Sequence, residues 1–125
     1  MKVILLAGGL GSRLAEETKV RPKPMVEIGG IPIIEHIMQW YMKFGYKEFI
    51  ICLGYKGTEI INYFKEYHLR NSTVIIDSKG KIETVEKKSN PWKIILAQTG
   101  NNTQTAGRIK KIRKFLKADE EFFMT

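Results

Sequence analysis

The chain has 125 residues, of which 43% are hydrophobic and 10% aromatic, which is enough apolar material for one compact domain with a core. The absence of an 18-residue apolar run, a charged-then-apolar leader or a lipidation signal argues against a membrane span and against secretion. The single cysteine, Cys52, excludes an intramolecular disulfide and fits a cytoplasmic location, and its apolar neighbours indicate a small core residue.

The net charge of +8 is concentrated in one region, because residues 79–117 hold eleven of the 21 Lys and Arg residues and only two of the 13 Asp and Glu residues. A basic stripe of this kind can bind nucleic acid, and residues 108–117 are where such binding would occur. The apolar residues of this stretch nevertheless recur at helical spacing; they are Ile109, Ile112, Phe115 and Leu116. We therefore favour an amphipathic helix with a solvated basic face, and we expect no nucleic-acid partner.

The first expected element is a strand at Val3–Ala7, an aliphatic run whose length suits burial on both faces of a parallel sheet. A loop that contains Gly8, Gly9 and Gly11 follows it directly. Where glycine removes the Cβ, the backbone can approach a phosphate closely and turn its N–H groups toward the oxygens. Because open α/β sheets bind ligands at the carboxyl ends of their strands, we expect a phosphate-binding loop here.

Two cations, Arg13 and Lys23, accompany this loop. The guanidinium of Arg13 matches phosphate oxygens in a bidentate manner, whereas the Lys23 ammonium acts as a point charge. Lys23 lies between Pro22 and Pro24, and a residue before proline is restricted to extended conformations, so we expect a stiff segment that holds the ammonium in place. The spacing fits neither the P-loop nor the Rossmann fingerprint, and the glycines alone would be equally compatible with an ordinary strand-to-helix turn.

The rest of the pattern alternates strands and helices, as a parallel sheet requires. The expected elements are a short extended piece at Met25–Ile28, a helix from Pro32 that stops at Gly45, a strand at Phe49–Leu53, a helix at Thr58–His68, a hairpin of Thr73–Asp77 and Ile82–Val85 around Lys79-Gly80, a strand at Trp92–Ala97 and a helix that begins at Thr105. We therefore predict an α/β fold with a Rossmann-like mixed, mainly parallel sheet flanked by helices.

Other reactive side chains are expected to play no part in a site. We expect His36 and His68 to be surface or half-buried helix residues, and Lys56 to be a surface lysine beside a tight turn. The neighbouring carboxylates of Glu16 and Glu17 would point in different directions on a helix, so they do not converge on a metal. The sequence predicts no metal site in this chain.

A polar loop, residues 99–105, leads into the helix that begins at Thr105. The free N–H groups and the dipole of a helix start favour an anion or a polar ligand. Ordinary capping by Thr103 or Thr105 explains the local sequence equally well.

Several of these segments resemble one family. LAGGLGSRL (residues 6–14), RPKPMVEIGGIPIIEHIM (21–38) and IICLGYKG (50–57) resemble the amino-terminal half of the sugar-1-phosphate nucleotidyltransferases, and QTGNNTQTAGRIKKI (98–112) is most similar to the glucose-1-phosphate cytidylyltransferase branch. The resemblance runs over residues 1–125. It implies the nucleotide-diphospho-sugar transferase fold, incomplete at the carboxyl end, with this chain as the amino-terminal nucleotide-binding part of one domain.

The resemblance also implies a reaction. CTP and α-D-glucose 1-phosphate would give CDP-glucose and pyrophosphate, a step of nucleotide-sugar and lipopolysaccharide O-antigen biosynthesis. Because the attacking phosphate oxygen is already an anion, the protein mainly aligns the reactants and neutralises charge, without a general base. The implied catalytic residues are Arg13 and Lys23, and the implied nucleotide-binding residues are Leu6, Ala7, Gly8, Gly9, Leu10, Gly11, Ser12, Arg13, Lys23, Thr103 and Arg108.

Finally, the resemblance implies a Mg²⁺ ion held by aspartates, the first of which follows a strand like that of residues 122–125. Mg²⁺ requires hard oxygen ligands, and we expect them beyond Thr125, so that this chain alone would be an inactive fragment. In full-length form the expected partners are CTP, glucose 1-phosphate and further copies of the protein, with no membrane partner.

Two alternatives remain open at this point. The chain could be a non-catalytic nucleotide-sensing or regulatory domain that keeps the glycine loop. It could also belong to a related sugar-1-phosphate nucleotidyltransferase that uses UTP or dTTP.

Overall fold

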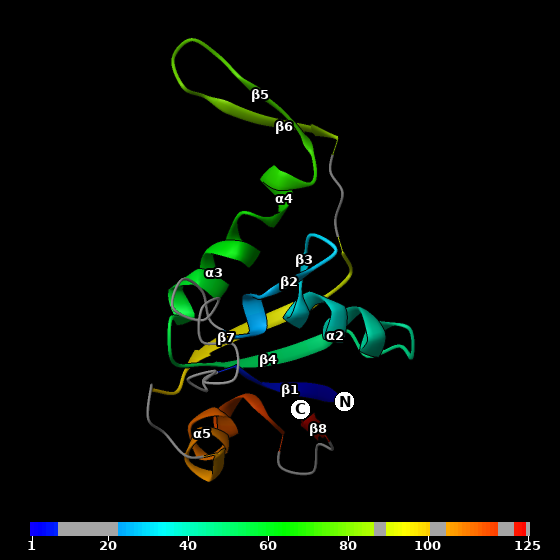
Figure 1. Ribbon diagram of the computed structural model, residues 1–125, viewed down its shortest axis with the longest axis vertical. Coiled ribbons are helices and arrows are strands. Elements are labelled where there is room, and N and C mark those ends of the chain that lie inside the picture. The colour runs from blue at the N-terminus through cyan, green and yellow to red at the C-terminus, as the bar shows by residue number, and fades with distance from the viewer. Residues whose placement is uncertain (8–22, 87–89, 101–104, 118–121, 125) are drawn as a thin grey trace.

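The computed structural model describes residues 1–7, 23–86, 90–100, 105–117 and 122–124, and a four-stranded parallel sheet lies at its centre (Figure 1). The strands, in their order across the sheet, are β7 (Lys93–Gln98), β4 (Glu48–Leu53), β1 (Lys2–Ala7) and β8 (Phe122–Met124). The strands predicted at Val3–Ala7, Phe49–Leu53 and Trp92–Ala97 are confirmed to within one residue at each end.

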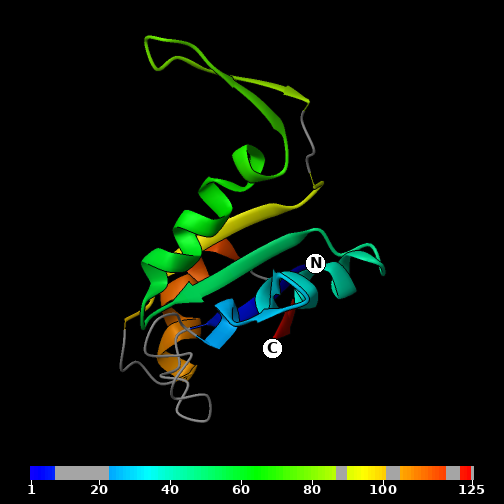
Figure 2. The same ribbon diagram turned by 45° about the horizontal axis from the view of Figure 1, so that its top comes forward.

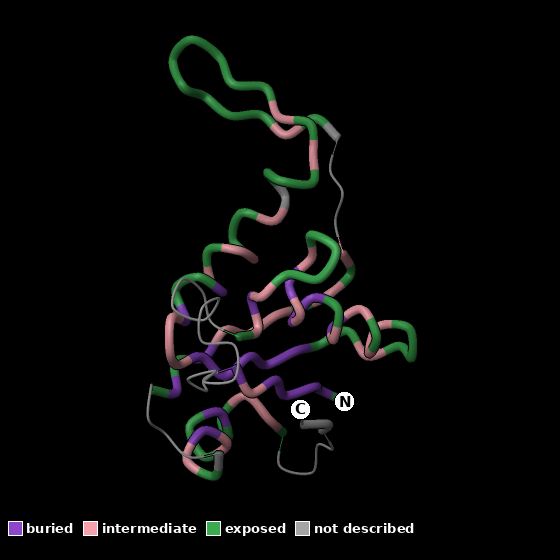
Figure 3. Tube along the Cα trace, in the orientation of Figure 1, coloured by how far each residue is buried: buried purple, intermediate pink, exposed green. Residues whose placement is uncertain are grey.

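The two middle strands are buried on both faces, as their unbroken aliphatic runs predicted (Figure 3). Val3 lies opposite Phe49, and Ile4 lies opposite Ile50. These four side chains are at most 1% exposed. Successive residues of a strand point to opposite faces, so this one pair of strands supplies the core on both sides of the sheet.

Helices cover the two faces separately, as the two views show (Figures 1 and 2). On one face α2 (Ile33–Met42) and α3 (Gly57–Lys65) pack Ile34, Met38 and Ile60 against alternate residues of β1 and β4. On the other face α5 (Thr105–Ile112) packs Ile112 against Ile4 and Ile50. The amphipathic pattern predicted for residues 108–117 is confirmed for most of its length, since its apolar side chains face this second cluster and Lys110, Lys111, Arg113, Lys114 and Lys117 are exposed. Arg108 is the exception, because it is buried.

The order of the strands defines a switch point in the sheet. From β1 the chain moves outward to β4 and then β7, and it returns through α5 to place β8 on the opposite side of β1. Ligands of open α/β sheets bind beyond the carboxyl ends of the strands where the order reverses. The predicted α/β, Rossmann-like sheet is therefore confirmed, and the glycine segment begins directly at this point.

Three local predictions were wrong. The extended piece expected at Met25–Ile28 is limited to β2 (Glu27–Ile28), which pairs with β3 (Ile31–Pro32). Lys23, expected to be extended because a proline follows it, instead begins a 3-10 turn, η2 (Lys23–Met25). The proline ring at position 24 has a fixed φ and no N–H, and both properties suit the first turn of a helix.

The second wrong prediction concerns the helix expected at Thr58–His68, which breaks at Glu66 into α3 and α4 (Tyr67–Arg70). The third case is the basic helix, which ends at Ile112 and continues as the 3-10 turn η3 (Arg113–Phe115).

The predicted hairpin is confirmed as β5 (Thr73–Ile76) and β6 (Ile82–Glu86), an antiparallel pair that projects away from the sheet (Figures 1 and 2). Asp77 closes its turn, because the Oδ1 atom accepts hydrogen bonds from the N–H groups of Lys79 and Lys81, both at 2.9 Å. Gly80 supplies the left-handed conformation of this turn, with φ of 84°.

Candidate functional site

The carboxyl ends of three strands lie side by side at one edge of the sheet. Ala7, the last residue of β1, is level with Leu53 of β4, and Leu53 is level with Gln98 of β7. Neighbouring strands are about 5 Å apart. The segments that follow Ala7 and Gln98, which carry most of the predicted nucleotide-binding residues, therefore start within about 10 Å of each other.

The structure describes four of those predicted residues. Leu6 and Ala7 form the end of β1, Lys23 begins η2, and Arg108 lies in α5. The remaining ones lie outside the described residues; they are Gly8, Gly9, Leu10, Gly11, Ser12, Arg13 and Thr103. Their predicted roles stay predictions.

Lys23 is brought back to the end of β1. It is exposed and lines a cavity of about 190 Å³ together with Leu6 and Ala7. The backbone beyond it is fixed, because the Val26 N–H donates to the Lys23 carbonyl at 3.1 Å and the Ile33 N–H donates to the Val26 carbonyl at 2.9 Å. Ala7 and Lys23, the described residues on either side of the glycine segment, thus line the same cavity at the carboxyl end of β1.

Arg108 reaches the same edge from the other face of the sheet. Its Nη1 atom donates to the hydroxyl oxygen of Thr99 at 2.6 Å and lies 3.4 Å from the carbonyl oxygen of Leu53. The residue is only 6% exposed, so its charge is held among polar groups at the ends of β4 and β7. The structure therefore places Arg108 beside the ends of β4 and β7, and the nucleotide contact that the resemblance implied for it stays a prediction.

Thr99 is the residue of this group that the sequence interpretation did not single out. It is fully buried directly after β7, and both its N–H and its hydroxyl donate to the Leu53 carbonyl, at 3.0 and 2.7 Å. The Lys111 ammonium donates to the Thr99 carbonyl at 3.0 Å. A hydroxyl residue immediately after a buried strand was the available signal, since that position lies at the carboxyl edge of the sheet.

The family model for nucleotidyl transferases matches residues 2–125, which is almost the whole of the chain. The chain belongs to the nucleotidyl transferase family. Its predicted relationship to the sugar-1-phosphate nucleotidyltransferases is confirmed by a curated relative, the glucose-1-phosphate cytidylyltransferase of Salmonella typhimurium, which is 49% identical over 126 aligned residues. The alignment covers 100% of this chain and 49% of that enzyme, so the chain spans about half the length of the curated relatives it matches.

Solved structures support the same fold for this member of the nucleotidyl transferase family. The UTP-bound UGPase from Acinetobacter baumannii superposes with a TM-score of 0.71 at 19% identity, over 98% of this chain and 44% of that one. A UDP-glucose pyrophosphorylase in complex with UDP-glucose superposes with a TM-score of 0.68 at 23% identity, over 98% of this chain and 43% of that one. At these identities the similarity is evidence for the fold alone.

Of the residues expected to lie outside a site, His36 and Cys52 have the surroundings that the sequence predicted, whereas Lys56, expected at the surface, is half-buried. His36 is exposed on α2, and its Nε2 atom lies 2.8 Å from the Ile28 carbonyl oxygen. Cys52 is fully buried in the core; burial raises the pKa of its thiol, and the nearby Arg108 charge partly offsets this. Lys56 is half-buried in a left-handed conformation before α3, with its ammonium over the Tyr55 ring.

Within the described ranges, no group of three or more His, Cys, Asp or Glu side chains is placed so that it could hold a metal ion. Glu16 and Glu17 lie outside those ranges. Likewise, none of the helices in the described part of the chain is both long and apolar enough to cross a membrane.

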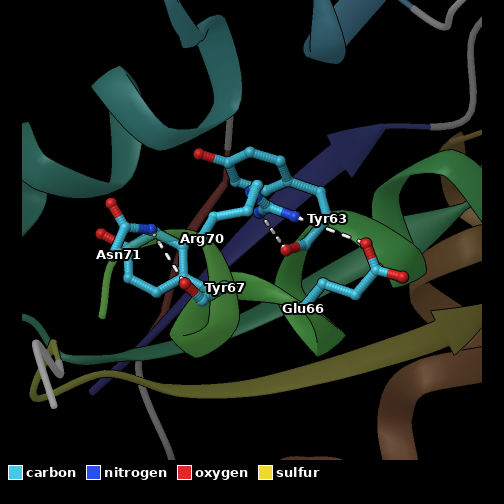
Figure 4. Close-up of polar contacts among 5 residues, drawn as sticks. All are labelled: Tyr63, Glu66, Tyr67, Arg70 and Asn71. Atoms are coloured by element: carbon cyan, nitrogen blue, oxygen red, sulfur yellow. Dashed lines mark hydrogen bonds and ion pairs between the residues drawn. The ribbon is translucent and has the colours of Figure 1, made fainter. Parts of the chain in front are cut away.

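A second, larger cavity of about 660 Å³ lies between α2, α4 and the β2–β3 turn. Glu35 is only 4% exposed there, and its carboxylate accepts hydrogen bonds from the Tyr63 hydroxyl and from the Gln39 amide, the latter at 2.8 Å. The Arg70 guanidinium covers the Tyr63 ring, with its central carbon 4.2 Å from the ring centroid, and donates to the Tyr63 carbonyl (Figure 4). The Glu35 carboxylate thus joins α2 to α3 through Tyr63, and Arg70 joins α4 to the same tyrosine.

Replacing Tyr63 by phenylalanine is expected to lower the free energy of unfolding by about 1–3 kcal/mol, because the buried Glu35 carboxylate loses a hydrogen-bond donor. Urea unfolding followed by circular dichroism measures this. The matched control is Phe64→Leu, which changes an adjacent ring without removing a hydroxyl and should leave the pH dependence of stability unaltered. Equal stability of wild type and Tyr63→Phe would contradict the assigned role.

The same hydroxyl makes stability depend on pH. Burial, and next the Glu35 carboxylate, raise the pKa of Tyr63 above its usual range. The neutral hydroxyl is thus favoured in the folded state, so its contribution is complete below the unfolded pKa of about 10 and is lost as the pH rises above that value. As the pH rises from about 10 upward, the stability difference between wild type and Tyr63→Phe should therefore shrink.

Proposed function

We propose that this chain is the nucleotide-binding part of an enzyme that transfers a cytidylyl group from CTP to α-D-glucose 1-phosphate, giving CDP-glucose and pyrophosphate. The observation that carries the proposal is the 49% identity to a glucose-1-phosphate cytidylyltransferase over the whole chain. The positions of Ala7, Lys23 and Arg108 at the carboxyl edge of the sheet support it. In the cell, we propose a cytoplasmic homo-oligomer.

In the proposed reaction a phosphate oxygen of glucose 1-phosphate attacks the α-phosphorus of CTP. A new phosphorus–oxygen bond forms as the bond to the β-phosphate breaks, and pyrophosphate leaves. The attacking oxygen is already ionised, so the task of the protein is to align the two phosphates and to balance their charge. This accounts for a site built from cations and backbone N–H groups.

Each residue of the proposed site has a separate task. Backbone N–H groups from Leu6 to Ser12 would bind the phosphates, and Arg13 would hold them in a bidentate manner. Lys23 would balance the charge of the triphosphate from its place near the carboxyl end of β1. Thr103 and Arg108 would contact the nucleotide at the ends of β4 and β7.

We also propose Mg²⁺ as the cofactor, because the charge on a triphosphate and on departing pyrophosphate calls for a hard divalent cation. The oxygen ligands would come from the part of the relatives' length that this chain does not span. When bound, the ion would neutralise phosphate charge next to Arg13 and Lys23.

The test is an assay of the full-length protein with glucose 1-phosphate, Mg²⁺ and, in parallel reactions, CTP, UTP or dTTP. We expect CDP-glucose and pyrophosphate from CTP at the highest kcat/KM. A higher kcat/KM with UTP or dTTP would instead assign the protein to another branch of the family. Nucleotide binding without product from any of the three would instead favour a nucleotide-sensing domain.

A further inference from the structure

Thr99 has hydrogen-bonding roles that the structure fixes completely. A hydroxyl group has one hydrogen to donate and lone pairs that accept. The hydroxyl of Thr99 lies 2.7 Å from the Leu53 carbonyl oxygen, which can only accept, so its hydrogen points there. The Arg108 Nη1 atom, 2.6 Å away, can only donate, so it binds a lone pair of the same oxygen.

The Thr99 hydroxyl therefore bridges the Leu53 carbonyl at the end of β4 and the guanidinium of Arg108 by hydrogen bonds. All three groups are at most 6% exposed, and Thr99 itself is fully buried. In such surroundings hydrogen bonds to a charged group are stronger than at the surface, and an arginine left without its partner is costly. The planar guanidinium is consequently held in one orientation at the ends of β4 and β7.

A second basic residue of α5, Lys111, also forms a hydrogen bond with Thr99. Lys111 follows Arg108 by three positions, which places both side chains on one side of α5. Its ammonium donates to the Thr99 carbonyl at 3.0 Å, whereas Arg108 binds the Thr99 side chain. Thr99 thus gathers two positive charges at the carboxyl edge of the sheet, where the proposed nucleotide site lies.

We propose that Thr99 is a positioning residue for nucleotide binding: its hydroxyl orients the Arg108 guanidinium so that this cation meets the nucleotide beyond β4 and β7. The inference rests on the proposed function, since it needs a nucleotide at this edge. It adds a residue that the resemblance did not imply and gives it a task distinct from contact with the ligand.

A purely structural role for the hydroxyl predicts a different behaviour. The link between β7 and β4 is already made by the Thr99 N–H, which donates to the Leu53 carbonyl at 3.0 Å. Valine has nearly the shape of threonine and keeps this backbone bond. Thr99→Val therefore removes the hydrogen bond between the hydroxyl and Arg108, and it leaves the hydrogen bond between the Thr99 N–H and the Leu53 carbonyl in place. Serine keeps the hydroxyl and removes only a methyl group.

The experiment titrates the full-length protein with CTP by calorimetry, well below the thermal midpoint of each variant. Thr99→Val is expected to weaken CTP binding about tenfold, and Thr99→Ser should bind as wild type does. Thr84→Val is the matched control, because it makes the same change on β6, in the hairpin at the opposite end of the molecule from α5 (Figure 1). It should leave the affinity for CTP unchanged.

A double-mutant cycle separates positioning from general weakening of the site. In an Arg108→Ala background, Thr99→Val should cause no further loss of CTP affinity, because its effect passes through the missing guanidinium. An undiminished loss in that background would overturn the proposal, as would wild-type affinity for Thr99→Val itself. In either case CDP-glucose formation by the wild type would leave the proposed function standing. Failure of the wild type to bind CTP would remove both.

Discussion

Replacement of Arg13 by alanine in the full-length protein is expected to lower turnover by about 10²–10³-fold while the fold is retained. The reason is chemical, because a guanidinium binds two phosphate oxygens at once and stabilises charge that neither water nor an alanine can hold in a fixed geometry. Pyrophosphate release from CTP and glucose 1-phosphate measures the loss, and circular dichroism checks the fold.

Arg113→Ala is the matched control for this prediction. Arg113 is exposed on η3, so its removal changes the net charge of the protein equally without touching the proposed site. Near-normal pyrophosphate release by Arg13→Ala would remove Arg13 from the catalytic residues. An equal loss in both variants would indicate a general effect of charge.

Replacement of Lys23 by alanine is expected to lower turnover by about 10²-fold, because one of the two cations that balance the triphosphate is lost. The backbone of this lysine is placed near the carboxyl end of β1 by a 3-10 turn, in which its carbonyl accepts a hydrogen bond from the Val26 N–H, and its side chain lines a cavity with Leu6 and Ala7. Lys23→Arg should recover only part of the activity, since a planar fork does not replace a point charge.

The control here is Lys43→Ala, at an exposed lysine directly after α2. It should retain wild-type pyrophosphate release. If Lys23→Ala raised the KM for CTP and left kcat unchanged, Lys23 would bind ground state and transition state equally and would lose its catalytic role.

The central sheet could be predicted from sequence because its strands are short, unbroken aliphatic runs. A strand without polar side chains on either face must be buried on both faces. The alternation of such strands with amphipathic helices then indicates a parallel sheet. The positions of β1, β4 and β7 follow from these local properties alone. Their order across the sheet was not predicted, since it depends on how the connections pack.

The local deviations depend on tertiary contacts. Nothing in the helical pattern of residues 58–68 marks a break at Glu66, and the turn η2 begins at Lys23 although a proline follows it. Both occur where a segment packs against a neighbour: η2 places Met25 in the core, and α4 places Arg70 over Tyr63. Propensity is a weak guide at such places because packing overrides it.

In the candidate site, too, local sequence features could be predicted and contacts between distant residues could not. The motifs allow a prediction of which residues bind phosphate, because glycines and cations act through local backbone and charge. The Thr99 hydroxyl and the Leu53 carbonyl are 46 positions apart, and the Tyr63 hydroxyl and the Glu35 carboxylate are 28 positions apart. Such pairs are created only by the folded chain, so they were not visible in the sequence.

The hairpin of β5 and β6 has a consequence for the dynamics of the molecule. Ile75, Ile76, Ile82 and Val85 are each more than half exposed, so the hairpin gains little from burial, and a lone two-stranded ribbon is marginally stable in water. It should therefore open without the rest of the fold, as a unit of its own. In a hydrogen-exchange experiment, the amides of Thr73–Ile76 should exchange long before those of β1 and β4, and a protease should cut first near Lys79.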